Sequence, residues 1–578
     1  GSISAGNDHL YVIDGIPLSR DTKYATGSTN TQFPDNPINV LSTINTDDIE
    51  SIEVLKDASA AAIYGSRGSN GVVLLTTKRG KEGKTTISYD TFVGAQTVSK
   101  KIDMVNAYEY AQLSYEAKNN AYLDRNPNGK PTDSNDIRNR GVGAPSTLIQ
   151  PEIVPYLSGQ PGLTDTDWQD AIFRTAPIQN HTLSISGGKD NVRFYVSGNY
   201  LDQRGVVINS GFKRYSARAN VDVKSGRLTV GMNLNPTYSY HDLIKAEGPY
   251  LGEGVVGLAL QMPPIFPVYN TDGSYNWQGN AWGYGATSIL NPVAIADQVS
   301  DKLSQLRLLG NAFAQYEIIK GLSYRLSVGT DINTFQRDYF RPSTLEIRDR
   351  KGASVPTGFS RAQNFVNWLV ENTLNYNRSF GVHNVSALAG FTSQKDRRVA
   401  NELTATNFPN DLVYTLNAGQ VSSGGSDIQE WSLLSYLGRA QYDYNGKYLV
   451  SAAIRADGSS RFGRDNRWGY FPSVSAGWNV SQESFMKSAT WLSDLKIRAS
   501  YGLTGNFQIP NYGSVSLLNY QNYILGPETI VTGLAPGNSA NDKLKWEKTA
   551  MLDVGFDASF LSNKLSLTFD YYNANTSD

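Results

Sequence analysis

The residues best suited to catalysis or metal binding are scarce in this chain. It contains four histidines, His9, His181, His241 and His383, and no cysteine. No histidine lies in an H-E-x-x-H motif or at another metal-ligand spacing, and without cysteine there is neither a thiolate nucleophile nor a Cys-ligated zinc site. No G-x-S-x-G motif is present either. We therefore predict no catalytic residue, no metal site and no cofactor.

Two glycine-containing segments match nucleotide-binding motifs in residue type but lack the secondary structure that those motifs require. Residues 83–85 (Gly-Lys-Thr) match the end of a phosphate-binding loop, but Lys78 stands where its first glycine belongs and no helix is predicted to follow. Residues 252–257 contain the dinucleotide pattern G-x-G-x-x-G, but no strand precedes them and no βαβ unit surrounds them. We interpret both segments as loops.

Two stretches rich in Asp and Asn offer oxygen ligands for calcium. They run from Asn126 to Asp136 and from Asp457 to Asn466. Neither has the regular oxygen spacing of a calcium-binding loop. A calcium site and a solvated hairpin tip both stay open as interpretations, and the irregular spacing favours the hairpin tip.

The composition excludes some classes of protein and favours strands. The formal net charge is −1 and 18% of the residues are charged, which argues against a nucleic-acid partner. The 53 Gly, 34 Tyr and 9 Trp favour strands joined by tight turns, with aromatic rings available for a membrane interface or for stacking on a ligand. No run of 18 apolar residues exists, so transmembrane helices are excluded, whereas a transmembrane barrel needs strands that are only half apolar.

From about residue 84 onward the chain alternates apolar and polar residues with period two. In residues 213–223, for example, Tyr215, Ala217, Ala219, Val221 and Val223 alternate with Arg214, Ser216, Arg218, Asn220 and Asp222. We count roughly fifteen such strands, many about ten residues long. Ten residues at about 3.3 Å each, tilted by about 45°, rise about 23 Å, close to the apolar band of an outer-membrane barrel. This pattern favours a membrane barrel over a soluble β-protein, with the apolar set toward lipid and the polar set toward the lumen.

The predicted connections fall into two kinds. Short turns such as residues 443–446 and 562–563 alternate with long stretches rich in Pro, Gly and Asn. The long stretches are residues 119–166, 241–305, 341–362, 400–429 and 506–543, and the second carries the aromatic cluster Tyr269, Tyr275, Trp277, Trp282 and Tyr284. Unequal turns at the two ends are typical of an outer-membrane barrel, with the long loops outside. Residues 104–120 are predicted to form a helix after the first strand of the barrel.

Residues 47–80 are expected to form a small α/β unit. Thr46 is predicted to cap a short helical turn that holds Asp47 and Asp48 at its positive end. A strand at 51–55, a helix capped by Asp57 and ending at Gly65, a glycine loop and a buried strand at 72–77 follow. The predicted core of this unit consists of Ile49, Ile52, Val54, Leu55, Ile63, Val72 and Leu74.

The amino-acid sequence of this unit is similar to that of a known family. DDIESIEVLKDASAAAIYGSRGSNGVVLLTTKRG and the upstream LYVIDGIPL resemble the plug of TonB-dependent outer-membrane transporters of the SusC/RagA group. The resemblance continues through TDWQDAIFRTAPIQNHTLSISGG, RADGSSRFGRDNRWGYFPSVSAGWNVSQESFM and LKWEKTAMLDVGFDASFLSNKLSLTFDYYNANTSD, so it runs almost end to end. One departure is His9, where the family usually has proline.

The resemblance implies an all-β fold with a small α/β plug inside a transmembrane antiparallel β-barrel. Residues 1–83 are expected to be the C-terminal part of the plug domain and residues 84–578 a partial barrel. The family's barrel has about 22 strands, so about seven strands are expected to follow residue 578. An open sheet would leave unpaired edges in lipid. The TonB-contacting box and any N-terminal extension are expected to precede residue 1.

The resemblance also implies a function, which is TonB-dependent import of a nutrient across the outer membrane of a Gram-negative bacterium. The implied partners are TonB, a SusD-like surface lipoprotein as lid, outer-membrane lipid, and an oligosaccharide or, alternatively, a peptide as cargo. The predicted ligand-binding residues are Asp21, Lys23, Tyr24, Asn30, Gln32, Phe33, Tyr64 and Arg67. Packing in the plug core stays open for Tyr64, and so does a salt bridge to the barrel wall for Arg67. A passive porin, an adhesin and a surface glycan hydrolase remain more distant alternatives.

Overall fold

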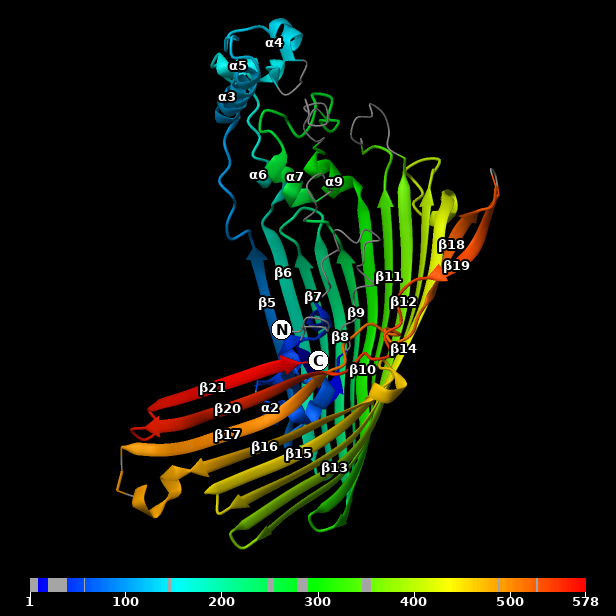
Figure 1. Ribbon diagram of the computed structural model, residues 1–578. Helices are drawn as coiled ribbons and strands as arrows, with labels where there is room; N and C mark the ends of the chain where they lie inside the picture. The colour runs from blue at the N-terminus through cyan, green and yellow to red at the C-terminus, as the bar shows by residue number, and fades with distance from the viewer. Residues whose placement is uncertain are drawn as a thin grey trace.

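The computed structural model describes residues 9–18, 39–56, 58–142, 147–246, 254–277, 289–345, 355–486, 488–489, 491–526 and 529–577. Two sheets dominate these residues (Figure 1). A four-stranded sheet belongs to what we call the N-terminal unit, residues 9–80 as far as they are described, and a fifteen-stranded antiparallel sheet forms what we call the wall. Within the described ranges, no helix is both long and apolar enough to cross a lipid bilayer.

The wall follows chain order with one insertion. Its strands are β5 (Gly83–Gln96), β6 (Ala176–Lys189), β7 (Val192–Arg204), β8 (Gly211–Ser225), β9 (Leu228–Asp242), β10 (Ser300–Ile319), β11 (Leu322–Arg341), β12 (Thr357–Phe380), β13 (His383–Thr406), β14 (Gln420–Tyr444), β15 (Tyr448–Ser459), β16 (Trp468–Asn479), β17 (Leu492–Asn506), β20 (Glu547–Phe560) and β21 (Leu565–Ser577). A separate hairpin of β18 (Leu518–Ile524) and β19 (Ile530–Pro536) interrupts the order. The expected fifteen strands are therefore confirmed, although they are longer than expected, at 12 to 25 residues.

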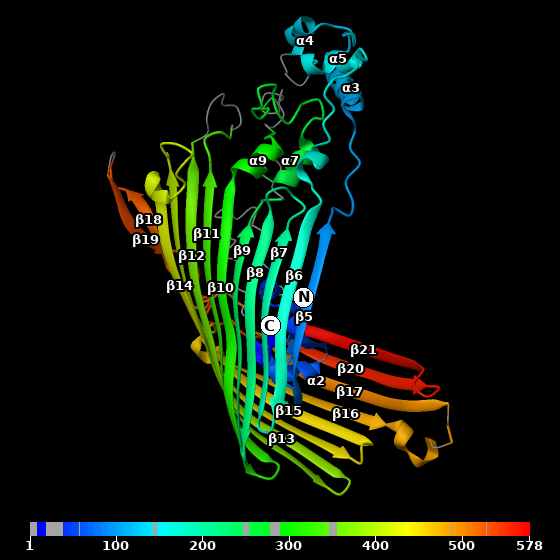
Figure 2. The same cartoon turned by 180° about the vertical axis from the view of Figure 1, so that it is seen from behind.

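Strands β5 and β21 lie at the two edges of the wall, and within the described residues they do not pair with each other. The sheet therefore curves without closing, as the partial barrel predicted from the sequence requires. Figure 2 shows the same open sheet from behind. The N-terminal unit lies in its concavity (Figure 1).

The connections confirm the predicted asymmetry between the two ends of the wall. Tight turns at one end use residues that tolerate positive φ, such as Asp190 (54°), Gly321 (87°) and Asn445 (54°). The other end carries helices α3 (Ala107–Arg125), α4 (Asn135–Val142), α5 (Val154–Leu157), α6 (Trp168–Ile172), α7 (Val255–Gln261) and α9 (Pro292–Gln298). Helix α3 confirms the helix predicted at residues 104–120. The remaining long connections were expected to be irregular, which is wrong for α4, α5, α6, α7 and α9, because periodicity does not reveal helices of only four to eight residues. Several of these segments share an apolar core that includes Ile153, Leu258 and Phe266.

The N-terminal unit contains β1 (Leu10–Ile13), β2 (Ile16–Pro17), β3 (Ile49–Leu55) and β4 (Val72–Thr77) in the order β2-β1-β4-β3. Between the strands lie the 3-10 turns η1 (Val40–Thr43), η2 (Thr46–Asp48) and η3 (Ala62–Arg67) and the short helix α2 (Ala58–Ala61). The predicted strands are thus confirmed. The predicted cap residue is wrong, because Asn45, not Thr46, accepts a hydrogen bond from the Asp47 amide. Asp57 lies outside the described residues.

The predicted core of the N-terminal unit is partly wrong. Val72 is buried, and Leu55 and Leu74 pack against it. Ile52 and Val54, by contrast, are 60% and 53% exposed. They lie on the edge strand β3, whose far side has no neighbouring strand among the described residues. The opposite part of the same sheet face, around Ile13, Ile16 and Leu75, is buried against Leu309 of the wall.

Candidate functional site

The inner face of the wall binds the N-terminal unit mainly through polar side chains. In β8 the residues Arg214, Arg218 and Asn220 are buried, while the intervening Tyr215 is 50% exposed. The buried set is therefore the polar one, which is opposite to a water-soluble sheet. The sequence placed these polar residues on one face, but nothing in it indicated their partners.

Two adjacent carboxylates of η2 enter the wall side by side. Asp47 Oδ2 accepts hydrogen bonds from Asn180 Nδ2 (2.9 Å) and Thr182 Oγ1 (2.7 Å) of β6. Asp48 Oδ1 accepts from Tyr195 OH and Ser197 Oγ of β7, both at 2.7 Å. Asp47 is half-buried and Asp48 is buried, and these contacts satisfy their carboxylate oxygens where an unpaired charge would be costly.

Arg218 joins this site to a third carboxylate, that of Asp14. Its Nε lies 3.7 Å from Asp48 Oδ2, and its Nη1 lies 3.3 Å from Asp14 Oδ2. Both Arg218 and Asp48 have side chains that are only 2% exposed. Asp14 has a positive φ of 48° and also accepts hydrogen bonds from the amide and hydroxyl of Thr77. One guanidinium therefore links η2, the β1–β2 turn and β4 to the wall.

Two further arginines bind backbone carbonyls of the N-terminal unit. Arg214 donates to the carbonyls of Ser42 (2.9 Å) and Ile44 (2.6 Å). Arg307 donates to the carbonyl of Val40 (3.1 Å), while Asp331 holds the same guanidinium through two hydrogen bonds. The turns η1 and η2 leave these carbonyls free to accept because they are short. The wall thus binds the backbone of this segment as well as its charged side chains.

The turn at Tyr64–Arg67 forms a second attachment, on the opposite part of the wall. The Ser66 amide donates to Asp457 Oδ2 (2.8 Å), and Arg455 donates to the carbonyl of Ile63 (2.6 Å). Arg455 and Asp457 are themselves paired at 2.7 Å and lie on β15. Asp457 is therefore a buried wall residue, whereas residues 460–467 form the connection of the β15–β16 hairpin with exposed Arg464 and Asp465, as the hairpin-tip interpretation of the stretch 457–466 expects.

Gly65 lets this turn approach the wall closely. Its φ is +53°, and a Cβ at this position would lie 2.4 Å from Arg455 Cδ and 2.6 Å from Asp457 Oδ2. Any larger residue would be strained by its backbone and would also overlap the ion pair. The glycine that was predicted to end a helix is thus required for the contact.

Tyr64 and Arg67 are the two predicted ligand residues that the structure describes. Arg67 is buried and donates to Gln394 Oε1 of β13 at 2.6 Å, and Tyr64 packs against the apolar cluster of the N-terminal unit. Burial, with Arg455 nearby, lowers the pKa of Arg67 to about 10, and burial raises the pKa of the Tyr64 phenol. Both side chains therefore contact protein groups here, and their role toward a ligand stays a prediction. Asp21, Lys23, Tyr24, Asn30, Gln32 and Phe33 lie outside the described residues.

The inner face also carries a polar cavity close to the short-turn end. It has a volume of about 450 Å³ and is lined by side chains that include Ser386, Gln441, Ser451, Ser475 and Lys496. Arg498 lies at its border and pairs with Asp553 and Asp557, both at 3.2 Å, and with Asp570. Hydroxyl and amide groups of this kind suit a hydrogen-bonding solute.

Aromatic side chains gather at the long-loop end. The rings of Tyr269 and Tyr275 lie 5.2 Å apart, and that of Trp277 lies 6.4 Å from Tyr275. Tyr275 donates to Asp297 Oδ2 (2.8 Å), while Tyr269 is 48% exposed. Trp282 and Tyr284 lie outside the described residues. The described part of the predicted aromatic cluster is thus assembled, and part of it faces solvent.

The hairpin β18–β19 presents a second apolar surface at this end. Tyr520 pairs with Leu534 and Ile524 with Ile530, so these side chains share one face. Tyr520, Ile524, Ile530 and Leu534 are 82%, 75%, 68% and 55% exposed. Apolar exposure on this scale marks an interaction surface.

The calcium interpretation of residues 126–136, the less favoured of the two, gains no support. Asp133 Oδ2 accepts from Tyr122 OH and the Lys130 amide, both at 2.8 Å. The carbonyls of Pro131, Asp133 and Thr147 instead accept hydrogen bonds from the buried guanidinium of Arg138. Among the residues that the structure describes, no group of three or more His, Asp or Glu could hold a metal ion.

Two family descriptions match the chain. "TonB dependent receptor-like, beta-barrel" matches residues 264–578, and "TonB-dependent Receptor Plug Domain" matches residues 1–72. TonB-dependent receptor P3 of Formosa agariphila is 36% identical over 91% of this chain and 48% of its own length. TonB-dependent receptor SusC of Bacteroides thetaiotaomicron is 30% identical over 100% of this chain and 54% of its own length. The chain thus spans about half the length of these relatives.

Solved structures of related receptors also match the chain. The RagAB peptide transporter matches with a TM-score of 0.81 and 27% identity, over 100% of this chain and 62% of the solved chain. The siderophore receptor PirA of Acinetobacter baumannii matches with a TM-score of 0.54 and 12% identity, over 99% and 63%. This second likeness is one of fold alone.

Proposed function

The chain belongs to the TonB-dependent receptor family, and from this premise we propose that it imports a nutrient across the outer membrane with energy delivered through TonB. In this proposal the N-terminal unit is the plug, residues 1–83, and residues 84–578 belong to the barrel. The protein is multi-pass in the outer membrane of a Gram-negative bacterium. Its relatives named SusC and RagAB place it within the SusC/RagA type.

The observation that carries the proposal is the polar attachment of the plug. Asp48, Arg218 and Arg455 hold it through ion pairs and hydrogen bonds, whereas Leu309 is the one buried wall residue in the apolar clusters of its described residues. Polar groups released from such contacts can exchange their partners for water, which an apolar core cannot do. An interface of this kind holds the plug at rest and lets part of it move under a mechanical pull.

We propose an oligosaccharide as cargo. Exposed Tyr269 with Tyr275 and Trp277 suits sugar rings, because stacking buries C–H surface while hydroxyls stay hydrogen-bonded. The serine- and glutamine-lined cavity of the inner face offers donors and acceptors of the same kind. A peptide is the second candidate, because the solved relative RagAB is described as a peptide transporter.

We further propose a SusD-like surface lipoprotein as the lid over the long-loop end. The exposed face of hairpin β18–β19 supports this partner, since Tyr520 and Ile524 are otherwise left in water. TonB is the second protein partner.

Deletion genetics tests the transport proposal. Removing the gene, or TonB, should abolish growth on one polymer or peptide source and leave growth on its monomers unchanged. Uptake that persists without TonB would assign the protein to the passive porins. A liposome swelling assay separates the two independently, because a plugged transporter should give swelling no faster than protein-free vesicles.

Pull-down experiments with the full-length protein test the lid. The variant Y520S/I524S should retain at least tenfold less lipoprotein than the wild type. Tyr269→Ser is the matched control, since it removes an exposed aromatic ring at the same end without touching the hairpin. Equal retention by both variants would contradict docking on the hairpin.

A further inference from the structure

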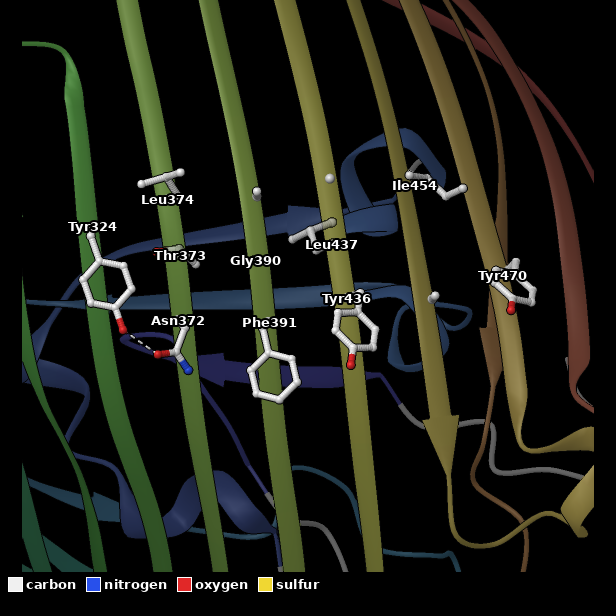
Figure 3. A pocket seen from close by; sticks show the side chains of 13 residues that line it. Tyr324, Asn372, Thr373, Leu374, Gly390, Phe391, Tyr436, Leu437, Ile454 and Tyr470 are labelled. Carbon is white, nitrogen blue, oxygen red and sulfur yellow. Dashed lines mark hydrogen bonds between the residues drawn. The ribbon is translucent and has the colours of Figure 1, made fainter.

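The outer face of the wall, the face away from the N-terminal unit, carries a groove of about 610 Å³ (Figure 3). Its floor is a row of paired positions across β12 to β15, namely Leu374, Ala389, Gly438 and Ile454. The two central residues are small, so the surface is hollow between Leu374 and Ile454. The neighbouring row contains Asn372, Phe391, Tyr436 and Tyr470, whose side chains form one lip of the groove.

The groove is apolar and accessible. Leu374, Tyr436 and Ile454 are 41%, 51% and 54% exposed. The one amide in the lip, Asn372, accepts a hydrogen bond from Tyr324 OH at 2.6 Å. Its acceptor is thereby engaged, and the groove offers mainly hydrocarbon and ring surface to an occupant.

The residues above and below the groove indicate its depth in a membrane. Toward the short turns, the outer face ends in aromatic residues, with the His383 and Tyr444 rings 5.1 Å apart. Toward the long loops, the outer positions of β13 become basic at Lys395 and Arg397. The twelve-residue distance from His383 to Lys395 spans about 28 Å along the membrane normal at a strand tilt of about 45°. This is close to the hydrocarbon thickness of about 30 Å, so Ala389 lies near the midplane.

The basic residues form a small charged cluster at the outer boundary of this apolar band. Lys395 Nζ lies 3.2 Å from Glu430 Oε2, and Arg397 Nε lies 3.0 Å from Glu430 Oε1. Two cations share one carboxylate, so the cluster keeps one net positive charge. Lys395 and Arg397 side chains remain 43% and 53% exposed, and can reach an anion.

From this geometry we propose that the groove holds an acyl chain of an anionic, phosphate-bearing lipid of the outer leaflet, with its head group at Lys395 and Arg397. Six residues separate Ala389 from Lys395, which is about 14 Å along the membrane normal. Half the hydrocarbon core is about 15 Å thick, so one acyl chain reaches from the charged cluster to the groove. The charge of the cluster selects the head group, and the hollow between Leu374 and Ile454 selects the chain. The assignment rests on the membrane placement proposed above and is independent of the cargo.

Filling the groove tests the chain contact. A Cβ at Gly438 would lie 3.8 Å from Ile454 Cγ2, so the position accepts a side chain without a backbone clash. Gly438→Leu should therefore fold and bind dioleoylphosphatidylglycerol at least tenfold more weakly, measured by native mass spectrometry of the full-length protein. Ala217→Leu is the matched control, because Ala217 is an exposed small residue on the outer face of β8, away from the groove. Tyr436→Ser removes part of the lip without adding volume and should also weaken lipid binding, which keeps the test valid if Gly438→Leu fails to fold.

Changing the cluster tests the head-group contact. K395Q/R397Q should lose about tenfold in affinity for dioleoylphosphatidylglycerol and keep its affinity for uncharged dioleoylglycerol. Glu430→Gln frees both cations and should strengthen binding of the anionic lipid. Equal lipid affinity in the wild type and in Gly438→Leu would overturn the proposal. A shift from dimer to monomer in Gly438→Leu with unchanged lipid binding would also overturn it, and would assign the groove to contact between copies. Flotation of the wild type with lipid vesicles checks the membrane placement separately.

Discussion

The two faces of the wall reverse the usual relation between polarity and burial. On the inner face of β8, Arg218 is 2% exposed, whereas on the outer face Tyr215 is 50% exposed. The outer face is mainly apolar apart from polar positions such as Lys395 and Arg397, and the inner face is polar and partly covered by the N-terminal unit. The buried side chains of the wall are therefore largely polar groups that have hydrogen-bonding partners, and many of its exposed side chains are apolar. A protein that sits in lipid and encloses a polar plug requires this arrangement.

The comparison also separates the two kinds of stabilisation. Charged groups of the inner face that are buried away from water are costly to leave unpaired. Outer-face groups depend on the solvent around the protein, which is hydrocarbon in the membrane placement proposed above. Substitutions should thus have effects that depend on the face rather than on hydrophobicity alone.

The largest effect is expected at the buried carboxylate Asp48. Asp48→Ala leaves Tyr195 OH and Ser197 Oγ without their acceptor and removes one of the two carboxylates paired with Arg218, and should cost about 3–5 kcal/mol of attachment of the N-terminal unit. Since the chain has no cysteine, a fluorophore on Glu53→Cys reports the release of the unit in a urea titration of the full-length protein.

The matched control is Glu50→Ala. Glu50 pairs with Lys81 at 3.0 Å, but the two side chains are 40% and 82% exposed. An exposed pair contributes about 0–1 kcal/mol. If both variants shifted the midpoint of the urea titration equally, the distinction between buried and solvent-exposed polar contacts would be wrong.

A smaller effect is expected at Gly65. Gly65→Ala forces a positive-φ backbone and places a methyl against Arg455 and Asp457, which should cost about 2–3 kcal/mol. The same labelled protein measures the release. Gly15→Ala is the control, because its φ of +90° is also strained but no atom lies within 4 Å of the added Cβ. An equal cost at both positions would mean that the backbone strain, and not the contact with the wall, sets the effect.

Two adjacent residues of β13 test the comparison directly. Ala387→Arg places a cation on the outer face and should cost about 2 kcal/mol of folding into lipid vesicles. Ser386→Arg places the same side chain in the polar cavity of the inner face, and should change the folding free energy by less than about 0.5 kcal/mol. Urea titration of both variants in vesicles measures the difference. Equal costs would show that Ala387 does not face lipid.

The smallest effect on stability is expected on the hairpin β18–β19. Ile530→Ser removes an apolar side chain that is 68% exposed, and should change the unfolding free energy by less than about 0.5 kcal/mol. A large loss of stability would show that the hairpin is packed within the protein and is not a docking surface.

The sequence by itself determined the elements that depend on local pattern. Alternation placed the strands of the wall, and the turn residues placed their short connections. The unit at residues 47–80 was recognisable from its strands, its glycine positions and its sequence similarity to a known family. Helices α5, α6 and α7 were missed because segments of four to seven residues give too little periodicity.

Only the tertiary structure decided which groups meet. Period two assigned Arg214 and Arg218 to one face of β8, but it could not say that Asp48, 170 residues earlier than Arg218, would complete their site. The exposure of Ile52 and Val54 was unpredictable for the same reason, since a pattern defines two faces of a strand and not what covers each face. Gly65 shows this most clearly. Its type permitted a turn anywhere, and the close approach of Arg455 and Asp457 from β15 made glycine necessary.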